Sequence, residues 1–488
     1  MKITEFLKLI SPYINLCGNI MDESRVVKKL SVDSREVDDK TVFFCLKGEK
    51  ADGHSYIDRS IKKGVAVIVG EKDLKIDNYI KVGSTRKTLE AISSSFYGDP
   101  QNFLKMIGIT GTNGKTTVSY MIENGLKEIT PTAVIGTLGY KIEDKTVYVP
   151  NTTPFIWKWY ELLSEIREHN VKTVVAEISS HGLDQDRIKG TLFDVAVFTN
   201  LSRDHLDYHK DEESYYQAKK KLFTCYLKKE GRAVINIDTP YGSRLFNELP
   251  CEMDKKSVSL KDKNSALYVE IISESPTGTF VNFNYKGEAA KGHVSMIGRF
   301  NVYNAACAVM AVEKFAGFKK AVENVCVKTV VSGRMEMVGG KPVFIDYAHT
   351  PDALCNILSS VKKSAEKGRI IVVFGAGGDR DKGKRKEMGK IVSEMADIAI
   401  VTDDNPRTEN PQDIVKEIVD GFLKNECQKV VIHDRRKAIR HAVKLMKEDD
   451  IVIIAGKGAE DYQIVGTEKQ RFSDKEEVEI ILRELKDV

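Results

Sequence analysis

The sequence predicts an α/β protein with three domains. Its 488 residues are too many for one hydrophobic core, because chains of this length usually divide into domains of ~150 residues. Short apolar runs alternate with helix-length segments from about residue 102, which is typical of mainly parallel sheets. Because this pattern restarts near residue 333, we expect a small N-terminal α/β domain, a central domain and a Rossmann-like doubly wound C-terminal domain, in residues 1–100, 101–332 and 333–488.

The composition excludes several classes of protein. The 75 Lys and Arg residues nearly balance the 71 Asp and Glu residues, and the net charge of +4 favours no nucleic-acid partner. The N-terminus lacks the apolar core of a signal peptide, and no apolar run approaches the ~20 residues that a bilayer span needs. The 8 cysteines are scattered singly, which suits reduced thiols rather than a disulfide framework. We expect a cytoplasmic monomer with no membrane span and no nucleic-acid partner.

The first domain carries two apolar runs, Thr41–Leu46 and Val65–Val69, that we predict to be buried strands. The turn Asp33-Ser34-Arg35 precedes the first run, and the polar loop Lys47–His54 follows it. Each of these polar segments, taken alone, is equally compatible with ordinary surface turn chemistry. The turn-forming segment Tyr97–Gln101 is the expected linker to the central domain.

A glycine-rich turn in the central domain predicts a phosphate-binding loop. An apolar run, Lys105–Ile109, is followed by the turn Gly111-Thr-Asn-Gly-Lys-Thr-Thr117 and by the helical pattern of Val118–Leu126. Such a turn presents backbone N–H groups to an anion, while Lys115 adds a positive charge and Thr116 is placed to ligate Mg²⁺. An isoleucine occupies the position of the usual first glycine, so an ordinary glycine turn is the alternative. We predict a nucleoside triphosphate site in a domain that is similar to the P-loop ATPases.

The rest of the central domain has the pattern of a parallel sheet with an appended hairpin. Two segments of alternating character, Ala266–Ile272 and Thr279–Tyr285, predict an antiparallel hairpin, and a helix is expected over Asn301–Ala311. The other predicted strands of this domain are 105–110, 132–136, 172–178, 193–199 and 232–237.

Two polar clusters follow predicted strands of this domain. Glu177 ends an apolar run, where a carboxylate suits Mg²⁺, a cation that takes oxygen ligands. The second cluster, Asn200–His209, contains His205 and His209 at i,i+4 spacing and precedes Lys219. This histidine pair is also compatible with zinc or with a plain surface loop, although no companion cysteine or His-Glu-x-x-His pattern supports zinc. A site for a Mg²⁺-bound nucleotide fits the phosphate loop better.

The C-terminal domain has the pattern of an open doubly wound sheet. Three polar, glycine-rich loops, Gly375–Arg385, Asp403–Arg407 and Ala455–Asp461, each follow an apolar run. In such sheets, ligands bind beyond the carboxyl ends of the strands. We therefore predict a ligand site at this edge. The predicted strands are 342–346, 370–374, 398–402, 430–432 and 451–454.

Together these motifs resemble the Mur ligases, the ATP-dependent amide-bond-forming enzymes of peptidoglycan synthesis. The resemblance runs through all three predicted domains in order. Its motifs are Gly111-Thr-Asn-Gly-Lys-Thr116, Glu177 with Ser-Ser-His181, Asn200-Leu-Ser-Arg-Asp-His205, Gly298-Arg-Phe-Asn-Val-Tyr-Asn304, Gly333-Arg-Met-Glu336 and Ile345-Asp-Tyr-Ala-His349. The segments similar to the members that add the third amino acid are Gly377-Gly-Asp-Arg380, Asp403-Asp-Asn-Pro-Arg407 and Gly456-Lys-Gly-Ala-Glu460.

The resemblance implies a ligase that uses ATP and Mg²⁺ to add meso-diaminopimelate to UDP-N-acetylmuramoyl-L-alanyl-D-glutamate. The γ-phosphate of ATP would move to the side-chain carboxylate of D-glutamate, and an amine of the incoming amino acid would attack the acyl phosphate. Phosphoryl transfer of this kind depends on positioning and on charge neutralisation. The same chemistry with L-lysine or another diamino acid is the alternative.

The resemblance also implies site residues. The residues implied for catalysis are Lys115, Glu177, His205 and Lys219. The implied Mg²⁺ ligands are Thr116, Glu177, His205 and a CO₂-derived carbamate on Lys219, which is preferred to Lys220 and Lys221 because it follows Gln-Ala. The implied ATP contacts are Gly111, Thr112, Asn113, Gly114, Lys115, Thr116, Thr117, Asn304, Arg334 and Asp346.

Two further sets of residues are implied for the other substrates. Those for the UDP-linked dipeptide are Ser34, Asn151, Thr152, Thr153, Ser179, Gln185 and Arg187. Those for the amino acid are Arg380, Asp404, Asn405, Pro406, Arg407, Gly456 and Glu460.

The sequence departs from the family pattern at Glu49 and Lys50, which replace a polar pair, and at Ala459, where histidine is common. Within the superfamily, folylpolyglutamate synthetase is the nearest rival, but it lacks the Asp-Ser-Arg first domain and the Asp-Asn-Pro-Arg loop. The alternative of another class is a P-loop regulatory or transport ATPase. Such a protein would hydrolyse ATP without either of the other substrates.

Overall fold

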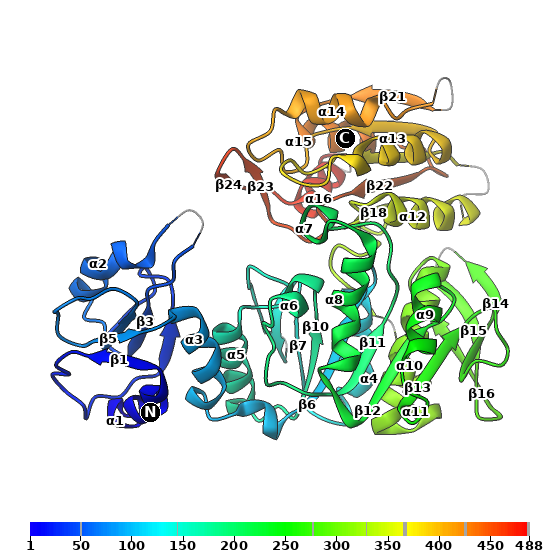
Figure 1. Ribbon diagram of the computed structural model, residues 1–488. Coiled ribbons are helices and arrows are strands. Elements are labelled where there is room, and N and C mark those ends of the chain that lie inside the picture. The colour runs from blue at the N-terminus through cyan, green and yellow to red at the C-terminus, as the bar shows by residue number, and fades with distance from the viewer. Residues whose placement is uncertain are drawn as a thin grey trace.

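The computed structural model describes residues 1–488 except 49–50, 144, 276–277, 328, 365–367, 424–426 and 486–488. Within the described residues the chain forms sheets of five, eleven and six strands and a separate two-stranded hairpin. Figure 1 shows the three sheets in three lobes, the N-terminal one in blue and the C-terminal one in yellow to red. The predicted α/β fold class is confirmed. The exact domain boundaries stay predictions, although each sheet lies within one of the predicted ranges.

The N-terminal sheet is mainly parallel and is covered on both faces. Its elements are α1 (Ile3–Ile10), β1 (Ile14–Cys17), β2 (Lys29–Ser31), β3 (Thr41–Phe44), α2 (Ile57–Lys62), β4 (Val67–Gly70), β5 (Tyr79–Val82) and α3 (Thr85–Phe96). The strand order is β1-β5-β4-β3-β2, with only β1 antiparallel to its neighbour. Helices α1 and α3 pack on one face and α2 on the other, so the strands β3 and β4 are buried throughout.

The first half of the central domain supplies its nucleotide-binding strands. Its elements are β6 (Lys105–Thr110), α4 (Lys115–Leu126), β7 (Thr132–Gly136), β8 (Gly139–Ile142), β9 (Lys145–Val147), α5 (Ile156–Glu168), β10 (Thr173–Glu177), α6 (Ser180–Asp184) and β11 (Phe193–Phe198). The second half contains α7 (Leu206–His209), α8 (Glu212–Thr224), β12 (Leu227–Asn236), α9 (Pro240–Glu248), β13 (Asp254–Ser259), β14 (Leu267–Ser275), β15 (Gly278–Tyr285), β16 (Glu288–Val294), α10 (Arg299–Ala316) and α11 (Phe318–Val325).

The central sheet has a parallel middle and antiparallel ends. Its order is β16-β15-β14-β13-β12-β11-β6-β10-β7-β8-β9. The seven consecutive strands from β14 to β7 in this order pair in parallel. Helices α5, α8 and α9 cover one face, and α4, α10 and α11 cover the other. In Figure 1, α3 of the first lobe lies beside α5 of the second.

The sequence analysis missed β8, β9, β13 and β16 in this domain, and the last two of these strands are polar. Strand β13 reads Asp-Lys-Lys-Ser-Val-Ser, and most residues of the edge strand β16 are not buried. Both strands form because neighbouring strands supply the backbone hydrogen bonds, which leaves little local hydrophobic signal. The predicted hairpin over 266–285 is therefore two strands of a larger antiparallel extension.

The C-terminal domain is doubly wound, as predicted. Its elements are β17 (Glu336–Met337), β18 (Val343–Asp346), α12 (Pro351–Ser364), β19 (Ile370–Phe374), α13 (Gly383–Met395), β20 (Ile398–Val401), α14 (Pro411–Val419), β21 (Gln428–Val431), α15 (Arg435–Leu445), β22 (Ile451–Ala455), β23 (Tyr462–Val465), β24 (Glu468–Arg471) and α16 (Asp474–Glu484). Helices α12 to α14 cover one face of the sheet and α15 and α16 cover the other.

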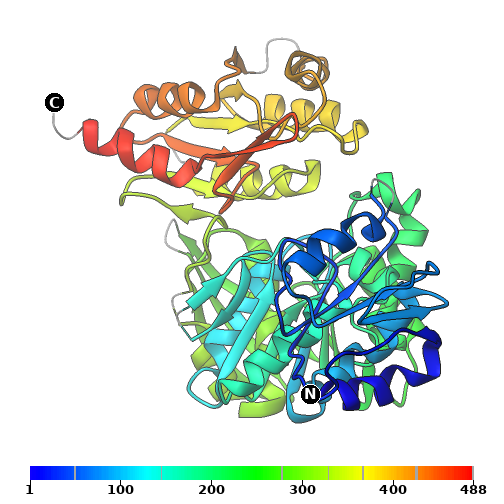
Figure 2. The same cartoon turned by 90° about the vertical axis from the view of Figure 1, so that its left-hand side faces the viewer.

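The strand order of this sheet decides where its loops meet. The order is β17-β18-β22-β19-β20-β21, and all strands after β17 are parallel. The loops that follow β18, β22, β19 and β20 therefore leave neighbouring strands at one edge. Figure 2 shows this lobe packed above the central one. Among the helices of the described residues, none combines the length and apolar character that a membrane crossing requires.

Candidate functional site

The phosphate loop lies at the carboxyl end of β6 and leads into α4. This helix begins at Lys115, three residues before the predicted start at Val118. Gly114 caps this helix with φ of +88°, and a Cβ there would overlap Asn304 Oδ1. Both the left-handed backbone and the close approach therefore require glycine. Lys115 Nζ donates hydrogen bonds of 2.9 Å to the carbonyl oxygens of Gly111 and Thr112. Burial lowers the pKa of this ammonium.

The loop opens into a cavity of about 580 Å³ that the central and C-terminal domains line together. The predicted nucleotide, metal and substrate residues in its lining are Thr112, Asn113, Gly114, Lys115, Thr116, Thr117, Thr152, Glu177, Ser179, His205, Asn304, Arg334 and Asp346. The structure thus brings together residues from distant motifs. The sequence analysis did not single out the lining residues Thr137, Asp238, Lys261, Tyr303 and Asp352.

The Glu177 carboxylate faces the phosphate loop from the end of β10. Its Oε2 accepts hydrogen bonds from Thr116 Oγ1 at 3.0 Å and Thr137 Oγ1 at 2.9 Å. Its Oε1 accepts a bond of 3.0 Å from Thr137 N, and a Cβ at Gly136 would overlap the carboxylate. Strand β7 and the loop after it therefore hold this side chain, a contribution that no motif indicated.

The C-terminal domain contributes directly to the phosphate loop. Arg334 Nη2 donates to Thr116 Oγ1 at 3.2 Å. Asp352 Oδ2 accepts bonds from Asn113 Nδ2 at 3.0 Å and Ser202 Oγ at 3.2 Å. Asp346 supports the turn next to Arg334, because its carboxylate accepts 2.7 Å bonds from two backbone N–H groups while burial raises its pKa. Asp352 opens an ordinary helix, so the sequence offered no signal for it.

The three consecutive lysines of α8 have different surroundings. Lys219 is buried, and its Nζ donates to the carbonyl oxygen of Gly111 at 2.8 Å. Lys220 instead pairs with Glu248 and Lys221 with Asp184, both near the surface. Burial, and then the nearby Lys115, lower the pKa of Lys219 well below its usual value. Lys219 is thus the lysine that the helix directs at the phosphate loop.

The two histidines of the second cluster lie in one aromatic group, since both rings pack against His181 and Tyr215, but their exposure differs. His205 has φ of +55° and lines the cavity, while the His209 side chain is buried against Tyr215 with ring centroids 5.1 Å apart. Desolvation lowers the pKa of His205, which favours the neutral ring. Among the described residues, no group of three or more His, Cys, Asp or Glu side chains is arranged to hold a metal ion. The His209 ring, which is buried and packs on Tyr215, fits a core residue.

The residues predicted for the UDP-linked substrate form a network around Thr153. Its Oγ1 donates to Glu177 O and accepts from Ser179 N, both at 2.9 Å. Arg187 Nη1 donates to Thr153 O at 2.8 Å, and its other nitrogens donate to Gln185 Oε1. The residues that line a small cavity of about 60 Å³ next to this network are Leu46, Arg86, Leu89, Glu90, Phe155, Ile156, Trp157, Gln185 and Arg187. N-terminal and central residues therefore meet at Arg187.

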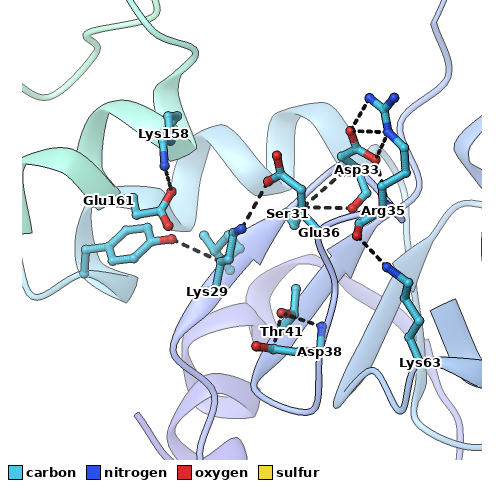
Figure 3. A network of polar contacts seen from close by, with 12 residues as sticks. Lys29, Ser31, Asp33, Arg35, Glu36, Asp38, Thr41, Lys63, Lys158 and Glu161 are labelled. Atoms are coloured by element: carbon cyan, nitrogen blue, oxygen red, sulfur yellow. Dashed lines mark hydrogen bonds and ion pairs between the residues drawn. The ribbon is translucent and has the colours of Figure 1, made fainter. Parts of the chain in front are cut away.

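Ser34 adjoins a polar network of the first domain, because its sequence neighbours Asp33 and Arg35 both belong to that network (Figure 3). It is buried, and the carboxylate of the preceding Asp33 accepts hydrogen bonds from Arg35, whose carbonyl oxygen accepts one from Lys63. Ser34 does not line either of the two cavities described above. Asn151 adjoins the cavity residue Thr152, and the departures at 49–50 lie outside the described residues.

Three loops of the C-terminal domain, Gly375–Arg385, Asp403–Arg407 and Ala455–Asp461, join in a set that we call the C-terminal loop cluster. Gly378 N donates to Asn405 O at 2.9 Å and Asn405 Nδ2 donates to Glu460 Oε2 at 3.0 Å. A Cβ at Gly378 would overlap the carbonyl of Pro406, and one at Gly456 would lie 2.5 Å from Asp404 Oδ2. The predicted amino-acid residues are therefore neighbours, as the strand order requires.

Arg380 and Arg407 lie against the same glycine of this cluster. A Cβ at Gly377 would lie 2.9 Å from Arg407 Nη1 and 3.8 Å from Arg380 Cγ. Each guanidinium bonds a backbone carbonyl, and among the described residues neither forms an ion pair with a carboxylate. Burial, and then Arg380, lower the pKa of Arg407. Two arginines placed beside one glycine in this way are suited to a carboxylate ligand.

The hairpin β23–β24, which the sequence analysis missed, holds the Asp403–Arg407 loop. Gln463 Nε2 donates to Asp404 O at 2.7 Å, and Ile464 N donates to Asn405 Oδ1 at 2.9 Å. Arg407 has φ of +52° and its N donates to Ile464 O at 3.1 Å. The strands of this hairpin are short and mostly not buried, so they carry little hydrophobic pattern.

Comparison with known proteins identifies the family. The matching models are the Mur ligase family catalytic domain over residues 26–97, the Mur ligase middle domain over 109–312 and the Mur ligase glutamate ligase domain over 333–458. A UDP-N-acetylmuramoyl-L-alanyl-D-glutamate–2,6-diaminopimelate ligase 1 from Clostridium acetobutylicum is 39% identical over 483 residues, covering 97% of this chain and 98% of the relative. The chain belongs to the Mur ligase family. It is therefore an ATP-dependent ligase.

Solved structures agree with this assignment. A UDP-N-acetylmuramoyl-L-alanyl-D-glutamate–2,6-diaminopimelate ligase superposes with a TM-score of 0.64 at 30% identity, covering 100% of this chain and 99% of the other. The folylpolyglutamate synthase of Mycobacterium tuberculosis, complexed with ADP and AMPPCP, has the same TM-score of 0.64 at 19% identity, covering 76% of this chain and 92% of its own. That second likeness shows a shared fold alone.

We expect the Lys115→Ala variant of this Mur ligase to lose ligation while keeping its fold. Removal of a charge that contacts the transition state typically costs ~10²–10³ in rate. The measurement is ADP release with all substrates at saturation, with circular dichroism as the check on folding. Lys220→Ala, which removes a surface ion pair from α8, is the matched control and should keep normal activity. Near-normal turnover of Lys115→Ala would show that the phosphate loop has no role in the reaction.

Proposed function

We propose that this protein adds meso-diaminopimelate to UDP-N-acetylmuramoyl-L-alanyl-D-glutamate, and that it does so as a cytoplasmic monomer. The choice of amino acid rests on Arg380 and Arg407, two arginines that lie beside one glycine, with Glu460 among the charges near Arg407. Diaminopimelate differs from lysine by a second carboxylate at its far end. A pocket with two guanidinium groups and a carboxylate matches two carboxylates and an ammonium. Relatives with this printed activity support the same choice.

The cavity at the phosphate loop is the proposed ATP site. Lys115 and Arg334 supply positive charge for the phosphates, and the backbone of the loop at the start of α4 supplies N–H donors. Thr116 Oγ1 and the Glu177 carboxylate lie 3.0 Å apart beside these groups. Two such oxygens, completed by phosphates and water, fit Mg²⁺, which would neutralise phosphate charge when bound. Asn304 and Asp346 complete the proposed nucleotide contacts.

The UDP-linked dipeptide is proposed to bind along the Thr153 network between the first and central domains. Arg187 offers a guanidinium for a carboxylate or phosphate, and Thr152 and Ser179 lead from there into the nucleotide cavity. The D-glutamate carboxylate would take the γ-phosphate of ATP, releasing ADP. The free amine of diaminopimelate would then attack the acyl carbon, form the amide bond and expel phosphate. The protein holds these groups in line and excludes water.

Lys219 is proposed to carry a carbamate, with His205 as its neighbour at a second metal position. The Lys219 amine is buried beside Lys115 and its pKa is lowered, so the neutral form that reacts with CO₂ is favoured. Attack of the nitrogen on CO₂ forms an N–C bond and releases a proton, which leaves a carboxylate in place of an ammonium. That oxygen donor suits Mg²⁺, whereas an ammonium repels it.

The overall reaction makes ADP release dependent on both other substrates. We expect ATP turnover to require the UDP-linked dipeptide and a diamino acid together, because the phosphoryl acceptor is the dipeptide and the acyl phosphate needs an amine. A coupled assay that omits each component in turn measures this dependence. Appreciable turnover with ATP alone would instead support the P-loop ATPase alternative.

Arg407→Asn should change the preference between amino acids. Asparagine tolerates the left-handed backbone that Arg407 adopts, so this variant removes the guanidinium without adding strain. A hydrogen bond to a charged group is worth ~1.5–3 kcal/mol. The kcat/KM for diaminopimelate should therefore fall roughly tenfold to a hundredfold, while that for lysine changes little.

Arg407→Lys is the matched control, because it keeps the charge but loses the planar fork. Its kcat/KM for diaminopimelate should lie between those of the wild type and Arg407→Asn. An equal fall in kcat/KM for both amino acids in Arg407→Asn, or a wild type that prefers lysine, would show that Arg407 does not recognise the distal carboxylate.

Lys219→Ala should be nearly inactive and should recover part of its activity when short carboxylic acids are added. The added carboxylate replaces the oxygen donor that the carbamate supplies. Nuclear magnetic resonance with ¹³C-labelled bicarbonate measures the modification directly in the wild type, and Lys220→Ala is the control that should keep the signal. An active, nucleotide-bound enzyme without a carbamate signal would rule this role out.

A further inference from the structure

Lys457 is a fully buried ammonium inside the C-terminal loop cluster. Its side chain is 0% exposed, and its Nζ lies 3.0 Å from Glu460 Oε2 and 3.2 Å from Asn405 Oδ1. A third acceptor, Asp404 Oδ1, lies 3.9 Å away. Burial of an ammonium is unfavourable unless its donors are paired, and these contacts pair it. Three residues that the family resemblance implies for the amino acid, Asp404, Asn405 and Glu460, thus surround a lysine to which it assigns no role.

The Asn405 amide closes a triangle with Lys457 and Glu460. Its Oδ1 accepts from Lys457 Nζ and from Ile464 N, two groups that can only donate, so the orientation of the amide is determined. Its Nδ2 then donates to Glu460 Oε2 at 3.0 Å. Each member of the triangle therefore holds the other two in place.

The two carboxylate oxygens of Glu460 have different hydrogen-bond partners. Oε2 accepts hydrogen bonds from both Lys457 and Asn405, whereas Oε1 accepts a longer one, of 3.4 Å, from the Tyr462 hydroxyl. Oε1 is therefore the oxygen with capacity for another donor.

We propose that Lys457 is a positioning residue of the amino-acid site. It anchors Glu460 through Oε2 and sets the Asn405 amide, so that Glu460 Oε1 is presented to an ammonium group of the incoming diamino acid. This inference rests on the proposed function, and it assigns recognition of the ammonium to Lys457, Asn405 and Glu460 as a unit. Recognition of the distal carboxylate by Arg407 is separate from recognition of the ammonium. Within the described part of the chain, no hydrogen bond or ion pair joins that guanidinium to the triangle.

The test is steady-state kinetics of Lys457→Met with diaminopimelate and with lysine as the varied substrate. Loss of a charge-assisted contact predicts that KM for diaminopimelate rises roughly tenfold to a hundredfold, while KM for ATP is unchanged. The kcat/KM for lysine should fall in parallel, in contrast to Arg407→Asn, because the ammonium is common to both amino acids. The same substitution at an exposed lysine of this domain, Lys437→Met, is the matched control and should leave every constant unchanged.

Three results would overturn the inference. They are an unchanged KM for diaminopimelate, a rise in KM for ATP as large as that for diaminopimelate, or a fall in kcat/KM for diaminopimelate without a fall for lysine. If Lys457→Met does not fold, Lys457→Gln serves instead, because its amide keeps a donor for Glu460 and should give a smaller rise in KM. Failure of the proposed function looks different: the wild type itself would release no ADP in response to a diamino acid.

Discussion

Two lysine side chains share one backbone carbonyl at the centre of this protein. Lys115 and Lys219 donate to Gly111 O at 2.9 and 2.8 Å, although they come from helices α4 and α8 on opposite faces of the central sheet. Like charges at this spacing repel strongly where water is scarce. The surroundings therefore favour anions, and both the phosphates of ATP and a carbamate on Lys219 would relieve the repulsion. The chemistry of the site follows from this one constraint.

The site extends across two domains. Arg334 and Asp352 reach the phosphate loop from the C-terminal domain, the first through Thr116 and the second through Asn113. Asp346 ends β18 directly beside Ala455 at the end of β22, and Gly456 N donates to Asp346 O at 3.1 Å. The nucleotide residues and the C-terminal loop cluster are thus built on adjacent strands. A change in domain orientation would move both substrates together.

Much of the site could be predicted because its signals are local. The phosphate loop, Glu177 and the three polar loops of the C-terminal domain each follow an apolar run that forms a strand. The supporting contacts could not be predicted in the same way. Thr137 and Asp352 stand in segments of ordinary composition, and they become important only because another strand or domain approaches them. Lys457 lies in a predicted loop, but only the fold shows which side chains it contacts.

The sequence by itself determined the α/β class, the strand–loop–helix order and the chemical groups at each strand end, since hydrophobic periodicity and turn chemistry act over a few residues. The tertiary structure alone decided that β22 lies between β18 and β19, which places the loops of the C-terminal cluster side by side. It also decided that Lys219, rather than Lys220 or Lys221, meets the phosphate loop. These outcomes depend on pairing and packing between segments far apart in the chain, and a local pattern carries no information about such contacts.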